Sequence, residues 1–244
     1  MKLEICVGSV VSAINAQAGG ADRVELCDNL FEGGTTPSYG AIKLCAEKLS
    51  VGIMVIIRPR GGDFLYNANE LQVMLDDVKM AGDLGVQGVV IGALKADGHV
   101  DVELCKRLVD AAGDLDVTFH RAFDMAVDYE QALEDVIDIG CSRLLTSGQE
   151  ISAFEGAERI AQMVEQAGDR LRILPGGGIN ARNMQKIVDI TGVSELHMSA
   201  HVSQASGMDY QHTGAFMGGA LRQEEFSISV ASADKVGQLK QIMS

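Results

Sequence analysis

The sequence has no long hydrophobic run. Its longest apolar stretch, Val51 to Ile57, is interrupted by Gly52 and falls far short of the roughly 20 residues that a membrane-spanning helix needs. Basic residues are also scarce, because 20 Lys and Arg against 34 Asp and Glu give a formal net charge of −14. Such a charge repels nucleic-acid phosphates and anionic lipids. We therefore expect neither nucleic acid nor a membrane as a partner.

The sequence also lacks the signs of an exported, disulfide-bonded protein. Glu4 lies where the apolar part of a signal peptide would have to be. The five cysteines are odd in number and widely spread, which argues against a disulfide framework. These features predict a cytoplasmic protein with reduced thiols.

At 244 residues, with 47% apolar residues and no linker or low-complexity tract, the chain is predicted to form one domain over residues 1–244. Its clearest pattern is a glycine, three further residues and then a short β-rich run. Glycine just past a helix allows the left-handed turn that ends it, so each copy indicates a helix-to-strand junction. The six copies begin at Gly20, Gly85, Gly113, Gly140, Gly168 and Gly192.

Amphipathic segments of helical length alternate with these β-rich runs. Two further strands are expected at Leu3–Cys6 and Gly52–Ile57. Eight strands and eight helices in 244 residues predict an α/β fold, a single (β/α)₈ barrel of the TIM type. The alternative is an open doubly wound sheet, which requires more continuously apolar strands. The expected helices are 9–18, 39–49, 68–84, 101–112, 129–139, 151–167, 183–191 and 232–243.

The repeated pattern also predicts which side chains enter the barrel. The fourth residue after the glycine is apolar, as in Val24, Val117 and Leu196, and is expected to face the helices. Alternate residues then face inward, toward the strand ends where barrel enzymes place function. The predicted mouth is polar and contains Glu4, Cys6, Glu25, Cys27, Arg58, His120 and His197.

Nine segments, taken in order, make nearly the whole chain resemble the CutC family of copper homeostasis proteins. The resemblance implies a TIM-type barrel, a cytoplasmic homodimer and a role in copper homeostasis. It also implies Cu(I) binding by Cys6 and Cys27. The segments are Glu4–Val7, Gly19–Cys27, Glu32–Ser38, Ile57–Phe64, Gly92–Leu94, Val117–Asp124, Leu145–Gly148, Pro175–Ile179 and His197–Ala200.

The chemistry of the two cysteines agrees with this implication. Soft thiolates suit Cu(I), and neighbouring strands about 4.8 Å apart can bring Cys6 and Cys27 together. The alternative is that both are ordinary buried thiols, because free cysteine commonly fills cores without any ligand.

An enzyme acting on a small anionic or phosphorylated metabolite is a second hypothesis. Arg58, Arg60 and Arg121 are expected at one rim, and Gly177, Gly178 and Ser199 follow the last two strands, where barrels commonly bind phosphate. Glu25 and His120 would transfer protons, with Glu4 tuning them. The sequence has no nucleophile elbow, zinc-protease motif or Walker loop that would name a reaction.

A third hypothesis is a non-catalytic binding or scaffold protein. Its partner would contact the loop 58–70 and the turn 33–38, where Pro37 restrains Thr36 to an extended conformation.

Overall fold

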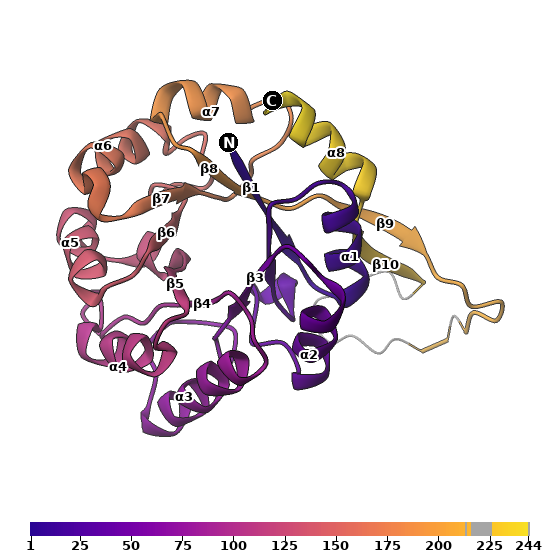
Figure 1. Cartoon of the computed structure of the whole chain (residues 1–244), viewed down its shortest axis with the longest axis horizontal. Coiled ribbons are helices and arrows are strands. Elements are labelled where there is room, and N and C mark those ends of the chain that lie inside the picture. Colours follow the sequence, from indigo (N-terminus) through magenta and orange to yellow (C-terminus); the bar gives the residue numbers. More distant parts are fainter. Residues whose placement is uncertain (213, 216–225, 244) are drawn as a thin grey trace.

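The computed structural model describes residues 1–212, 214–215 and 226–243. Eight strands form a central ring, and the helices lie around its outside (Figure 1). All the pairings within this sheet are parallel. The strands are β1 (Lys2–Val7), β2 (Arg23–Leu26), β3 (Gly52–Ile56), β4 (Gly88–Ile91), β5 (Asp116–Phe119), β6 (Arg143–Thr146), β7 (Arg172–Pro175) and β8 (Glu195–Met198).

The order of the sheet follows the chain. It runs β7-β6-β5-β4-β3-β2-β1-β8, and its two end strands, β7 and β8, lie against each other. The predicted (β/α)₈ barrel is therefore confirmed.

The helices begin where side chains cap their free N–H groups. Ser9, Ser38, Asp101 and Ser232 each accept a hydrogen bond from the first turn of the helix that follows. No helix among the described ranges combines the length and apolar character needed to cross a bilayer. The helices are α1 (Val10–Ala18), α2 (Tyr39–Lys48), α3 (Ala68–Asp83), α4 (Val102–Ala112), α5 (Tyr129–Ile139), α6 (Ala157–Ala167), α7 (Met184–Thr191) and α8 (Ala233–Ile242).

The structure differs from the sequence prediction in two places. Helix α6 begins at Ala157 and not near residue 151, because residues 151–156 form turns that end at Gly156. After β8 the chain forms an antiparallel hairpin of β9 (His201–Ala205) and β10 (Ser227–Ala231). This hairpin projects from the barrel in Figure 1, and the sequence pattern does not predict it, because its short strands follow no glycine of the repeated pattern.

The predicted alternation of strand residues is confirmed by the packing. Val24, Val117 and Leu196 belong to the large apolar cluster that also contains buried helix residues. Glu25 and His197 meet inside the ring. A small apolar cluster lies there too, formed by Cys27, Met54, Ile56 and Val90.

Gly88 is predicted to be required by the close approach of strands inside the barrel. A Cβ at this position would lie 2.3 Å from the carbonyl oxygen of Asp116 and 2.6 Å from Cε of Met54. Because a backbone carbonyl cannot move without its strand, Gly88→Ala should lower the free energy of unfolding by about 1–3 kcal/mol in urea titrations. Gly237→Ala is the control. It adds a methyl group in ordinary contact within α8 and should stabilise by about 0.5–1 kcal/mol. Similar effects of the two changes would contradict the role assigned to Gly88.

Candidate functional site

Two thiols face each other at the C-terminal ends of β1 and β2. The register of these strands places Cys6 beside Glu25, and the N–H of Cys27 donates to the carbonyl of Val7. The Sγ atoms of Cys6 and Cys27 are 3.9 Å apart. Both thiols are free, and Cys6 is the one cysteine of the five that is partly exposed. The structure thus brings together the pair that the sequence predicted as metal ligands.

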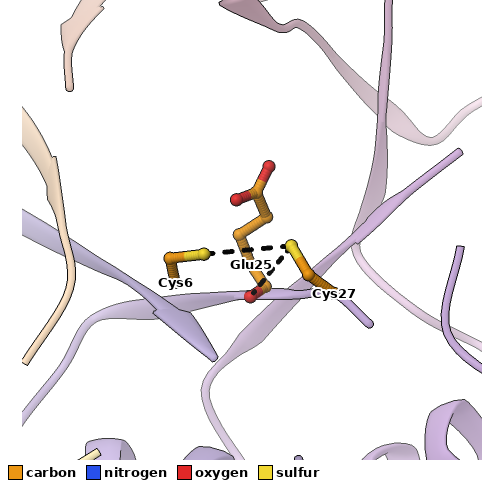
Figure 2. Close-up of side chains that lie close together, drawn as sticks. All are labelled: Cys6, Glu25 and Cys27. Carbon is orange, nitrogen blue, oxygen red and sulfur yellow. Dashed lines mark hydrogen bonds between the residues drawn. The ribbon is translucent and has the colours of Figure 1, made fainter. Parts of the chain in front are cut away.

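The carboxylate of Glu25 belongs to the same cluster. Figure 2 shows the side chain of Glu25 rising between the two facing sulfur atoms. One ligand atom from each of these three residues lies within 4.8 Å of the other two. They are the only such group of three among the described residues.

A chain of buried charges crosses the interior beneath this cluster. Arg23 is held between Glu4, through Nε, and Glu195, 2.8 Å from Nη2. Arg143 also contacts Glu195, with Nε 3.1 Å from Oε2. All four side chains are buried, so each charge depends on its neighbours for compensation.

His197 links the charge chain to the thiols. Its Nδ1 lies 2.7 Å from Oε1 of Glu4, and its Nε2 lies 3.7 Å from Oε2 of Glu25. Burial alone would lower the pKa of His197, but contacts with Cys6, Glu4 and Glu25 raise it well above its usual range. We infer that the imidazole is protonated at neutral pH.

The thiol of Cys6 is correspondingly acidic. The hydrogen bond from Cys27 is the largest cause and outweighs burial, and His197 adds to it, so that the pKa of Cys6 falls well below its usual range. Burial would raise the pKa of Glu4, but His197 and Arg23 lower it to about 2. The direction of these shifts favours a thiolate at Cys6 beside a protonated imidazole that the carboxylate of Glu4 orients.

The predicted proton-transfer residues do not form one group. Glu4 and Glu25 both contact His197, whereas His120 packs against Phe64, with ring centroids 5.1 Å apart. Among the described residues no hydrogen bond or ion pair joins His120 to Glu25. Burial, assisted by the charge of Arg58, lowers the pKa of His120 to about 3.

The six residues predicted to bind an anion fall into separate places. Arg58 and Arg60 are held within the loop after β3, where Arg60 pairs with Asp63 and Glu70. Arg121 pairs with Asp124. Arg121 also lies beside Gly177, because a Cβ added at Gly177 would be 3.3 Å from Nη1 of Arg121. Gly178 instead lies against Ser152, and Ser199 is exposed after β8.

The sequence prediction missed three members of the site, Arg23, Arg143 and Glu195. Each is the third residue after the glycine of the repeated pattern, two positions before an inward-facing residue. The same alternation that identified Glu25 and His197 therefore contained the signal for them.

Comparison with known proteins gives consistent matches. Residues 1–202 match the model of the CutC family. The chain is 52% identical over 241 residues to a CutC family protein of Chromobacterium violaceum, covering 99% of this chain and 97% of that one. It is 47% identical over 240 residues to the copper homeostasis protein cutC homolog of Homo sapiens, covering 98% of this chain and 88% of that one. A crystal structure of CutC from Streptococcus agalactiae superposes with a TM-score of 0.77 at 36% identity, covering 82% of this chain and 98% of that one.

The charge chain is predicted to be indispensable for stability. Arg23→Met would leave the carboxylates of Glu4 and Glu195 buried with reduced compensation, so the free energy of unfolding should fall by about 3–5 kcal/mol. Chemical denaturation measures this loss. The control, Arg170→Met, breaks an exposed pair with Glu134 and should shift the unfolding midpoint little. A loss no greater than that of the control would contradict the proposed compensation.

Glu25 should make stability fall as the pH rises. Burial, with the nearby Cys6 thiolate, raises its pKa from 4.5 to about 8, so the folded state holds this proton more tightly than the unfolded chain. The stabilisation that the protonated Glu25 gives the folded state is fully present below pH 4.5 and is lost as the pH rises through 8. Glu25→Gln cannot titrate, and its stability relative to the natural protein should increase from pH 5 to pH 8 by a few kcal/mol. Urea titrations across this range, with exposed Glu165→Gln as control, test the prediction. A constant difference would refute it.

Proposed function

The chain belongs to the CutC family, and from this premise we propose that it acts in copper homeostasis by binding Cu(I) between Cys6 and Cys27 at the mouth of the barrel. The observation that carries the proposal is the facing pair of thiols, with Sγ atoms 3.9 Å apart. A disulfide bond requires about 2.05 Å, whereas metal–thiolate bonds of about 2.3 Å allow the sulfurs of one ion to be up to about 4.6 Å apart. The spacing therefore suits a shared metal ion.

The donor set favours a soft ion. Two thiolates suit Cu(I), which needs few further ligands. The carboxylate of Glu25 is a harder donor, and its pKa near 8 keeps it largely protonated at neutral pH. We assign the two sulfurs as the ligands and leave the protonated Glu25 outside the ligand set. The pKa of Cys27 is raised by Cys6 and by burial, so binding of the ion releases the Cys27 proton to solvent.

Access to the thiols supports the same assignment. Cys6 is partly exposed while Cys27 is buried, so an arriving ion would meet Cys6 first. A cavity of about 390 Å³ lies over the ends of β1 and β2, lined in part by Gly8, Asp28 and His201. Gly8 directly follows β1, and Asp28 is the residue after Cys27, which supports an approach to the pair from this side.

The proposal includes a cytoplasmic location and a homodimeric state, both from the family resemblance. All five cysteines are free, and a reducing compartment would keep Cys6 and Cys27 available for Cu(I). Enzymatic action on a small anionic metabolite is the second candidate, favoured by the buried guanidinium of Arg58, which has no carboxylate partner among the described residues.

Replacing either member of the pair should abolish tight Cu(I) binding. Cys6→Ala and Cys27→Ala each remove one of two ligands, so the affinity should fall on the order of a hundredfold or more. Anaerobic competition with a chromophoric Cu(I) chelator measures it. Cys45→Ala and Cys105→Ala are matched controls, because both thiols are buried among apolar side chains of α2 and α4. The proposal fails if all four variants bind Cu(I) equally well.

A further inference from the structure

Three buried polar atoms without a hydrogen-bond partner gather in one place on the β3 and β5 side of the barrel. Among the residues that the structure describes, four buried side-chain atoms lack a partner, and three of them are Nε of Arg58, the hydroxyl of Tyr66 and Nε2 of His120. These residues are 4%, 9% and 4% exposed. Since an unsatisfied buried donor is costly, their association requires an explanation.

Contacts and charge place the three groups around Arg58. The ring of Phe64 lies 5.0 Å from Cζ of Arg58 and 5.1 Å from the ring centre of His120. Burial lowers the pKa of His120, and the charge of Arg58 adds to this effect. Burial raises the pKa of Tyr66 to about 12, while the charge of Arg58 and a side-chain contact of the guanidinium with the Tyr66 hydroxyl oppose the rise. Phe64 is the partly exposed member of this group, so solvent reaches its ring but not the three unpartnered atoms.

Arg58 forms no ion pair among the described residues, although its charge acts at a distance on the exposed Asp63. Its Nη1 donates to the carbonyls of Glu32, at 2.7 Å, and Gly34, at 2.9 Å, and its Nη2 donates to that of Gly62, at 2.8 Å. Carbonyl oxygens satisfy hydrogen bonds but supply no negative charge. No ion pair of Arg58 occurs within the described part of the chain, whereas Arg60 has two and Arg121 has one.

His120 contributes a donor and not an acceptor. Its Nδ1 accepts the backbone N–H of Ala122 at 3.1 Å. A neutral imidazole with an accepting Nδ1 carries its proton on Nε2. The unpartnered Nε2 is therefore an N–H donor, like the unpartnered Nε of Arg58, and the hydroxyl of Tyr66 can donate as well.

We propose that Arg58, Tyr66 and His120 form a binding site for the carboxylate group of a small organic anion, beneath the ring of Phe64. Three donors and one uncompensated positive charge match a group that has several acceptor sites and one negative charge. A phosphate group carries more charge than the site balances. The ligand enters by displacement of the Phe64 side chain, because the donor atoms themselves are buried.

The site is separate from the thiol pair although the two share a boundary. The carbonyl of Gly34 accepts from Arg58, and a Cβ at Gly34 would lie 3.3 Å from Sγ of Cys27. No residue donates to both proposed ligands. Loss of copper binding therefore need not remove the carboxylate site, and the two proposals can fail independently.

The test uses acetate as the probe and its neutral isostere acetamide as the control, with chloride keeping the ionic strength constant. Imidazole nitrogen resonances of His120 and the melting temperature are followed in the full-length protein. Acetate should shift the His120 Nε2 signal and raise the melting temperature saturably, while acetamide should do neither. Cys6→Ala and Cys27→Ala should keep both responses.

Two conservative variants locate the binding site. Tyr66→Phe removes only a hydroxyl, so the protein should fold normally and bind acetate at least threefold more weakly. Arg58→Lys keeps the charge but loses Nε, and should weaken binding at least tenfold. Tyr39→Phe changes an exposed tyrosine and should have no effect. Phe64→Ala should retain binding and shows that the covering ring does not hide the site.

Several outcomes would overturn the proposal. One is no saturable response to acetate in either the natural protein or Phe64→Ala, which would mean that water alone satisfies these donors. Equal acetate affinity in Tyr66→Phe, Arg58→Lys and the natural protein is another. A response to phosphate without one to acetate would exclude the carboxylate assignment.

Discussion

The interior of this barrel depends on the contact of Arg23 with Glu4 and Glu195. Barrels of this kind are commonly filled by branched apolar side chains, but here the lower layer is ionic and every member is buried. Glu4 lies directly across from Arg23 on β2 and from His197 on β8, so strand register alone brings the charges together. Each buried charge is tolerated because a neighbouring opposite charge compensates it. Glu4 in turn orients His197, and His197 contacts Cys6, so the charge chain also fixes the surroundings of the thiols.

Much of this arrangement could be predicted from the sequence because strand geometry has a period of two. Once the repeated glycine fixed the parity of each strand, Glu25, His197 and the outward Val24 followed without further information. The pairing of Cys6 with Cys27 needed one more fact, that β1 and β2 are neighbours. Arg23 and Glu195 have the same parity, but they lie at the N-terminal ends of their strands, away from the mouth where function was expected.

Other features could not be predicted because they depend on where loops turn. The anion-binding prediction assumed that arginines at one rim would meet glycines after β7. In the structure Arg121 does lie beside Gly177, but Arg60 and Arg121 are both paired with acids close in sequence, which charge counting over the whole chain does not reveal. The partners of Arg58 are backbone carbonyls up to 26 residues away, and no side-chain pattern encodes them. The start of α6 was misplaced because residues 151–156 have helical composition but turn conformation.

Gly34 has a consequence for how this protein can evolve. Its backbone adopts a φ of +93°, its carbonyl holds Arg58, and the space where a side chain would stand is bordered by the sulfur of Cys27. Gly34 thus borders both the thiol pair and the guanidinium of Arg58, the two groups on which the two proposed sites depend. A substitution at Gly34 that changes the surroundings of one group would also change those of the other. Few substitutions at this position can therefore be neutral.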